Sequence, residues 1–263
     1  MATQPPANLP LFYKNLIPLS SQQHEKFTSL PVDKAPHFAN THAVPLTIDE
    51  FILAQRFFPI VFSAGDNPVP LGLFGLNEGV NVYVDDEGKL KGELYVPAYV
   101  RRYPWMLAKL RQDSDELSLC FDPDSGLVGE FAEGVALFDG DKPSEATRQV
   151  LSFCEDFERS AQRTSAFVKE IQDMDLLMEG EVSIQLNEAD QPYIYRGFQM
   201  VNEEKLRDLR GDTVRKINQS GVLGFIFAHL FSLNHVREVF GKQLALGKVP
   251  GREAPADAPA ANG

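Results

Sequence analysis

The sequence predicts an α+β protein: a mainly antiparallel sheet packed against one long amphipathic helix, with a C-terminal helical subdomain. Short apolar runs separated by polar turn residues fill positions 60–96, as expected for strands. Apolar residues then recur every three or four positions over 144–171, the period of a helix. A third, mostly apolar run covers 222–240 and predicts a buried helix. Because short turns join antiparallel strands, we expect a meander rather than parallel units.

Residues 1–45 contain seven prolines and little regular pattern, yet apolar side chains recur, so we expect an arm packed on the domain. The sequence Thr47-Ile-Asp-Glu50 has the form of a capping box and predicts a short helix from Phe51 that ends at Pro59. Strands are then predicted at 60–63, 69–76, 80–84 and 89–96, because a turn sequence separates each from the next. We expect a short helix over 101–110 and a strand over 116–121.

Ser144 is placed to cap the long helix, whose outer face is charged. A second hairpin is predicted from 181–186 and 193–201, with its turn at 187–191. Short helices are expected over 203–209 and 212–220, followed by one buried helix over 222–240. We interpret 46–245 as a single domain and 246–263, rich in Pro and Ala, as a disordered tail.

The net charge is −12, and residues 113–190 hold 20 acidic and 5 basic side chains. An acidic face repels nucleic acid and anionic lipid, so we expect neither as a partner. Cys120 and Cys154 are isolated, which favours buried free thiols over a disulfide or a metal site. No signal peptide and no apolar run of about 20 residues is found. These features predict a cytoplasmic protein without a transmembrane segment, with export by a non-classical route left open.

The most informative segment, 92–105, combines four aromatic rings with two guanidinium groups: Tyr95, Tyr99, Arg101, Arg102, Tyr103 and Trp105. The chain holds one Trp and seven Tyr, so this concentration is unusual. In the first interpretation the rings fill the core while the arginines pair with the acidic long helix. In the second interpretation, one Arg forms a bidentate contact with a carboxylate and an aromatic ring stacks on the ligand. A protein–protein contact is a third interpretation, since Trp, Tyr and Arg dominate such contacts.

Other site chemistry is absent from the sequence. Five His are present, without the His-x-Asp/Glu triplet of an iron site, so no metal is predicted. His229 lies in the apolar run and is expected to make a buried hydrogen bond. No nucleophile elbow and no phosphate-binding loop occurs, so neither catalytic residues nor a cofactor can be named.

Seven short segments resemble a known family in their order and spacing: Ala43–Leu46, Phe58–Phe62, Tyr95–Pro104, Leu117–Asp122, Arg163–Phe167, Gly197–Leu206 and Ala228–Leu233. The chain is similar over residues 10–235 to the bacterial SapC family, named for a surface-layer locus. The resemblance implies a link to surface-layer or outer-membrane nutrient-uptake systems, and it carries over no catalytic residue. A peptide-transport permease shares the name but is a membrane protein, which this chain does not resemble.

We therefore expect a non-enzymatic accessory or binding protein of the SapC type, which engages a small peptide-like or aromatic ligand or a protein partner. The six residues of the aromatic–arginine segment are the expected site. One alternative is an enzyme that modifies a peptide or aromatic metabolite, with His24, His37, His42 or His229 as acid, base or ligand. A further alternative is a structural surface-layer component, which would require self-association, and a homo-oligomer is compatible with each reading.

Overall fold

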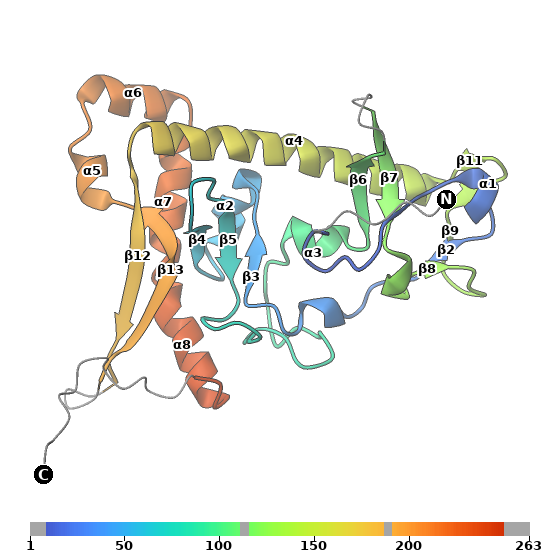
Figure 1. Cartoon of the computed structure of the whole chain (residues 1–263), viewed down its shortest axis with the longest axis horizontal. Helices are drawn as coiled ribbons and strands as arrows, with labels where there is room; N and C mark the ends of the chain where they lie inside the picture. Colours follow the sequence, from blue (N-terminus) through green and yellow to red (C-terminus); the bar gives the residue numbers. More distant parts are fainter. Residues whose placement is uncertain (1–8, 111–115, 187–190, 250–263) are drawn as a thin grey trace, which may run out of the picture.

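The structure is a computed structural model that describes residues 9–110, 116–186 and 191–249. It has an α+β architecture, which confirms the predicted fold class. The helix α4 (Glu145–Asp173) runs along one side of the molecule and joins two β-rich halves (Figure 1). Ser144 caps α4, its hydroxyl accepting the Thr147 backbone N–H at 3.3 Å, as the sequence predicts.

The larger half contains a five-stranded antiparallel sheet in the order β12-β13-β4-β5-β3. Its strands are β3 (Ala43–Pro45), β4 (Ile60–Ser63), β5 (Pro70–Leu73), β12 (Leu177–Ile184) and β13 (Tyr193–Val201). The two long strands from the second half of the chain form a hairpin that pairs with β4, at Phe198 opposite Ser63. The sheet is therefore assembled from two distant hairpin segments, and the predicted meander is wrong in this respect.

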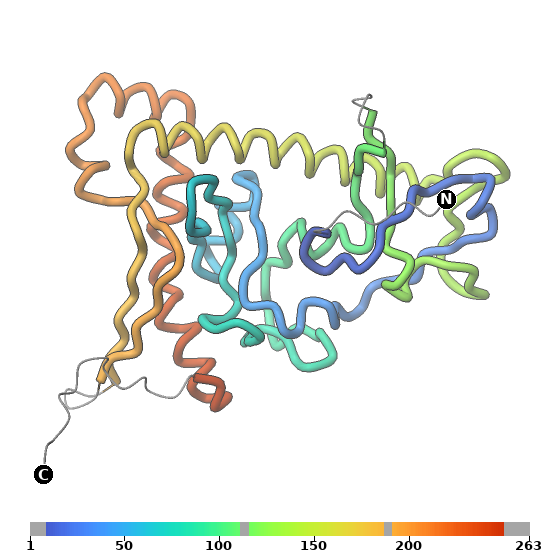
Figure 2. Tube along the Cα trace, viewed as in Figure 1, coloured from blue at the N-terminus to red at the C-terminus, as the bar shows by residue number. Residues whose placement is uncertain are grey.

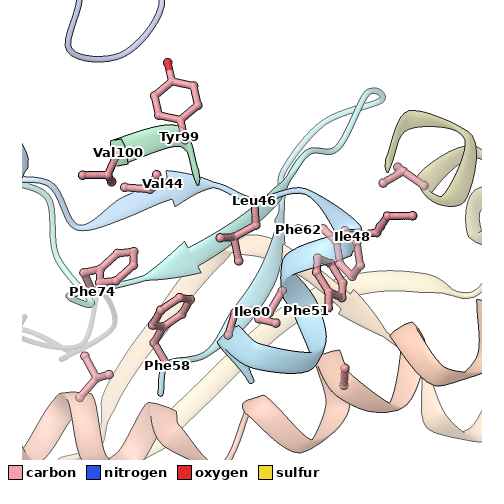
Figure 3. Close-up of a cluster of buried hydrophobic side chains, with 14 of the residues drawn as sticks. Val44, Leu46, Ile48, Phe51, Phe58, Ile60, Phe62, Phe74, Tyr99 and Val100 are labelled. Atoms are coloured by element: carbon pink, nitrogen blue, oxygen red, sulfur yellow. The ribbon is translucent and has the colours of Figure 1, made fainter. Parts of the chain in front are cut away.

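Phenylalanine dominates the core of this half. The short elements η2 (Ile48–Glu50) and α2 (Phe51–Ala54) cover the sheet beside α7 (Val222–Ser232). Fully buried rings meet between them, as Figure 3 shows for Phe51, Phe58, Phe62 and Phe74. Burying a ring of this size contributes about 1.5–3 kcal/mol, so this cluster is a major source of stability.

The smaller half surrounds the N-terminal part of α4. It contains one three-stranded sheet of β1 (Ile17–Pro18), β7 (Leu117–Phe121) and β6 (Trp105–Lys109), in that order. Another joins β8 (Val128–Gly129), β2 (Thr28–Ser29) and β9 (Val135–Ala136), and β10 (Phe138–Asp139) pairs with β11 (Lys142–Pro143). The N-terminal arm, with α1 (Ser21–His24) and η1 (Pro36–Phe38), runs through this half, as the blue trace in Figure 2 shows. It supplies the strands β1 and β2.

Helices complete the C-terminal region: α5 (Glu203–Arg207), α6 (Gly211–Gln219), α7 and α8 (His235–Ala245). The single helix predicted over 222–240 is in fact the pair α7 and α8. Between them the Asn234 side-chain amide donates to the Phe231 carbonyl oxygen at 3.1 Å, a local bond that competes with the helical ladder. Within the described ranges, every helix is too short or too polar to cross a lipid bilayer.

The segment from 80 to 110 also differs from the prediction. The strands expected over 80–84 and 89–96 do not form, and one isolated β-bridge between Val84 and Leu90 takes their place. Side-chain hydrogen bonds hold this loop instead, since the Asn81 amide donates to the Phe38 carbonyl oxygen at 3.0 Å. The helix expected over 101–110 is the short α3 (Ala98–Arg102), and β6 follows. Pro104 disfavours continuation of the helix, because it lacks an N–H and restricts the residue before it.

The turn expected at 187–191 and the tail expected from 246 lie largely outside the described residues, which omit 187–190 and 250–263. The remaining short helix is η3 (Pro123–Ser125), where Asp122 accepts the Asp124 backbone N–H at 2.9 Å.

Candidate functional site

The two adjacent arginines of α3 have opposite environments. Consecutive helical residues point about 100° apart, so one can face the core while the other faces solvent. Arg102 is 5% exposed, whereas Arg101 is exposed. The pair therefore divides into a buried cation and an accessible one.

Arg102 is held between aromatic rings below α4. Its guanidinium carbon lies 4.2 Å from the ring centroid of Phe157, 4.6 Å from that of Tyr99 and 5.9 Å from that of Tyr13. One terminal nitrogen lies 3.4 Å from a carboxylate oxygen of Glu158 on α4. These contacts match the first interpretation, in which an arginine pairs with the acidic long helix. They give Arg102 a structural role.

Arg101 is fixed in place without a counter-charge. Its Nε donates to the Val96 carbonyl oxygen at 3.1 Å, and Nη2 donates to the Tyr95 hydroxyl at 3.4 Å. The guanidinium carbon lies 5.2 Å from the ring centroid of Phe153 on α4. In the described part of the chain no carboxylate forms an ion pair with it. Its position is thus set by neutral groups, and its charge remains free to meet a ligand.

A buried glutamate supports this arrangement from below. Glu50 is 4% exposed, and its Oε1 accepts the Ala98 backbone N–H at 2.7 Å and the Tyr95 hydroxyl at 3.1 Å. Its Oε2 accepts the Thr47 backbone N–H at 2.8 Å, the bond that the capping box predicts. Burial raises the pKa of Tyr95 to about 12, so its hydroxyl keeps its proton at neutral pH. The start of α3 is therefore anchored to η2.

The other rings of the segment serve mainly to attach the N-terminal arm. Tyr99 donates its hydroxyl to the Leu11 carbonyl at 3.1 Å, and Figure 3 shows this hydroxyl pointing away from the core cluster. Tyr103 packs with its ring centroid 4.2 Å from that of His37. Burial raises the pKa of Tyr103 to about 12. The Trp105 carbonyl accepts the Tyr13 hydroxyl at 2.6 Å.

A cavity of about 300 Å³ lies between α3, the start of β6 and the N-terminal half of α4. We call it the arginine cavity. It is lined by Arg101, Arg102, Trp105, Ala146, Gln149, Val150, Phe153 and Cys154. The structure thus brings together three of the six residues expected at the site, and Tyr95 acts on it by holding Arg101. Tyr99 and Tyr103 lie away from it, in the attachment of the arm.

Sequence reasoning missed the wall that α4 contributes, Gln149 and Phe153 above all. Phe153 belongs to the apolar stripe of the long helix and was therefore expected in the core. It is instead half-buried beneath Arg101. Pairing α3 with α4 across about 50 residues requires the tertiary fold, which the sequence pattern does not specify. The aromatic residues Phe153 and Phe157 in the helical stripe were the signal available in the sequence.

Cys154 borders the arginine cavity as a protonated thiol. Burial raises its pKa to about 12 and that of Cys120 to about 11. Both cysteines are buried and free, as predicted. A neutral thiol is a weak nucleophile, so Cys154 contributes an apolar surface to this wall.

No histidine among the described residues lines the arginine cavity. His42 lines a separate cavity of about 130 Å³ with Tyr195 and Arg196. His229 is fully buried; its Nε2 accepts the Val201 backbone N–H at 3.1 Å and its Nδ1 faces the Ile60 carbonyl at 2.7 Å. The buried hydrogen bond predicted for His229 is therefore confirmed.

His24 and His37 pack against aromatic rings, His24 with its centroid 4.7 Å from that of Phe27. The described residues contain no group of three or more potential metal ligands.

Comparison with known proteins gives one match. A protein-family model, SapC, covers residues 19–239, which includes α3, α4 and every residue that lines the arginine cavity. No curated protein matches the chain, and no solved structure matches it.

Proposed function

Because the chain belongs to the SapC family, we propose that it is a non-enzymatic accessory or binding protein of the SapC type. It engages a peptide-like ligand or a protein partner at the arginine cavity. In this proposal it works in the bacterial cytoplasm and serves a surface-layer or outer-membrane nutrient-uptake system, the context that the family resemblance implies.

One observation carries the proposal: Arg101 is a fixed, accessible cation with no carboxylate partner in the described part of the chain, at the edge of a cavity with aromatic walls. Exposed arginines lose side-chain entropy when they bind, which weakens binding. Tyr95, Val96 and Phe153 already hold Arg101, so much of that loss is incurred during folding. Such preorganisation favours a binding role.

The acidic surface supports a neutral or singly charged ligand over a polyanion. With a net charge of −12, the protein repels nucleic acids at long range. A carboxylate or a protein surface with one exposed acid can still reach Arg101, because a contact inside the cavity is short-ranged.

Native mass spectrometry on the protein isolated from its own source tests the proposal. We expect a stoichiometric ligand or protein partner on the wild-type chain, and its loss from the Arg101→Gln variant. Arg237→Gln is the matched control, since Arg237 is exposed on α8 and lies outside the arginine cavity. Equal occupancy in wild type and Arg101→Gln, with unchanged melting temperatures, would contradict the proposal.

A further inference from the structure

Two guanidinium groups at the arginine cavity keep N–H groups that no described residue accepts. Arg101 keeps part of its guanidinium free, and within the described ranges no acceptor takes the buried Nε of Arg102. Trp105 lines the same cavity, and its side chain is only 6% exposed. An accessible cation beside a buried, unpartnered guanidinium N–H indicates a ligand that supplies acceptor oxygens.

Three acids of α4 contact arginines other than Arg101. Glu158 approaches Arg102, Glu145 binds Arg148 at 2.7 Å, and Asp156 pairs with Arg159. Glu155 follows Phe153 by two residues, which places it about 200° further around the helix. Arg101 therefore keeps its charge within an acidic neighbourhood.

Apart from Gln149 at the rim, the remaining walls of the cavity are apolar. Val150, Phe153 and the Trp105 ring face the space beside the two guanidinium groups. A ligand that fills this space must carry an acceptor group and an apolar group only a few bonds apart. A phosphate fits poorly, because one unpaired cation balances one negative charge and the acidic protein repels a dianion.

A terminal amino-acid residue has this combination, since its carboxylate and its side chain share one carbon atom. A volume of about 300 Å³ holds one such residue with a bulky side chain. Arg101 and Gln149 are exposed at the rim, so the preceding chain can leave toward solvent.

We propose that the arginine cavity binds the free carboxyl terminus of a peptide chain that ends in a bulky apolar or aromatic residue. The terminal carboxylate accepts from the Arg101 guanidinium, and the last side chain packs on Phe153 and Trp105. This inference rests on the proposed function and specifies its ligand.

Two matched probes test it: acetyl-Ala-Ala-Phe with a free acid and the same peptide as its amide. Trp105 is the one tryptophan of the chain, so its fluorescence reports binding at the cavity. We expect saturable binding of the acid, at least about tenfold weaker binding of the amide, and a loss of about tenfold or more for the acid in Arg101→Gln. Arg237→Gln should bind like wild type.

The same peptide attached to the C-terminus of a small carrier protein distinguishes the two sources of such an end. Binding of the carrier supports a protein terminus as the ligand, whereas binding of the free tripeptide alone supports a short peptide. Equal binding of acid and amide would overturn the inference and leave the proposed function standing. If no peptide binds but a natural partner still requires Arg101 for binding, the inference is again overturned and the proposed function stands. If a natural partner binds wild type and Arg101→Gln equally well, the proposed function is contradicted as well.

Discussion

Arg102 lies over the ring of Phe157, with its guanidinium carbon 4.2 Å from the ring centroid. This contact places a cation inside the junction between α3 and α4, where Tyr99 covers it from another side. Its neighbour Arg101 lies at the exposed edge of that junction, over Phe153. One residue of the pair therefore holds the fold, and the other is available for binding.

Replacement of Arg102 should destabilise the protein, whereas replacement of Arg101 should not. Arg102→Ala removes ring contacts, buried alkyl groups and the approach to Glu158, which together cost about 2–4 kcal/mol. Arg101→Gln at the surface should change the free energy of unfolding by less than about 0.5 kcal/mol. Urea unfolding measures both. Equal losses in the two variants would show that Arg101 is structural too.

The carboxylate of Glu50 should position the binding segment. Glu50→Gln replaces one acceptor oxygen with an NH₂ group. That group then faces the backbone N–H of Thr47 or of Ala98, so two donors meet without an acceptor. Loss of a buried, charge-assisted acceptor costs about 1–3 kcal/mol. We also expect weaker binding at the arginine cavity, because Tyr95 loses its acceptor and Arg101 its support. Glu155→Gln, exposed on α4, is the control. Unchanged stability of Glu50→Gln would contradict this account.

Acid should destabilise the fold through His229. Burial lowers its pKa from 6.5 to about 4, so the unfolded chain binds the proton first. The stability that neutral His229 contributes is complete above pH 6.5 and is lost as the pH falls toward 4, at up to about 1.4 kcal/mol per pH unit.

The variant His229→Gln should be less stable at pH 7 and should show a shallower fall between these pH values. The measurement is the free energy of unfolding against pH, with His235→Gln, at a half-buried histidine that begins α8, as the control. A wild-type profile that is flat from pH 6.5 to 4, or an identical slope in His229→Gln, would disprove the assignment.

Local patterns in the sequence predicted those elements that local chemistry determines. Ser144 and the apolar stripe located α4, and Thr47 with Glu50 predicted the capping box. The pattern could not distinguish β6 from a helix, because Trp105–Lys109 becomes a strand by pairing with β7. Tertiary pairing overrides local preference in such cases.

The candidate site was predicted in part, for a similar reason. The rings and arginines of 95–105 marked the segment. Which of these side chains pack in the fold and which line the cavity depends on contacts with α4 and the N-terminal arm. Arg101 and Arg102 are equivalent as sequence, and only the packing of Phe153 and Phe157 separates them. Tyr99 and Tyr103 were expected at the ligand site. In the structure the Tyr99 hydroxyl donates to the Leu11 carbonyl oxygen, and the Tyr103 ring packs against the His37 ring.

In the proposed complex, Arg101 recruits a carboxylate into the cavity lined by Trp105. The most direct test is the single indole ¹⁵N–¹H resonance of Trp105, followed while acetyl-Ala-Ala-Phe acid is added. We predict a saturable shift of this resonance in the wild-type protein and its absence in Arg101→Gln, with both proteins folded. The same shift in both proteins, or no shift in the wild type at millimolar peptide, would contradict the claim.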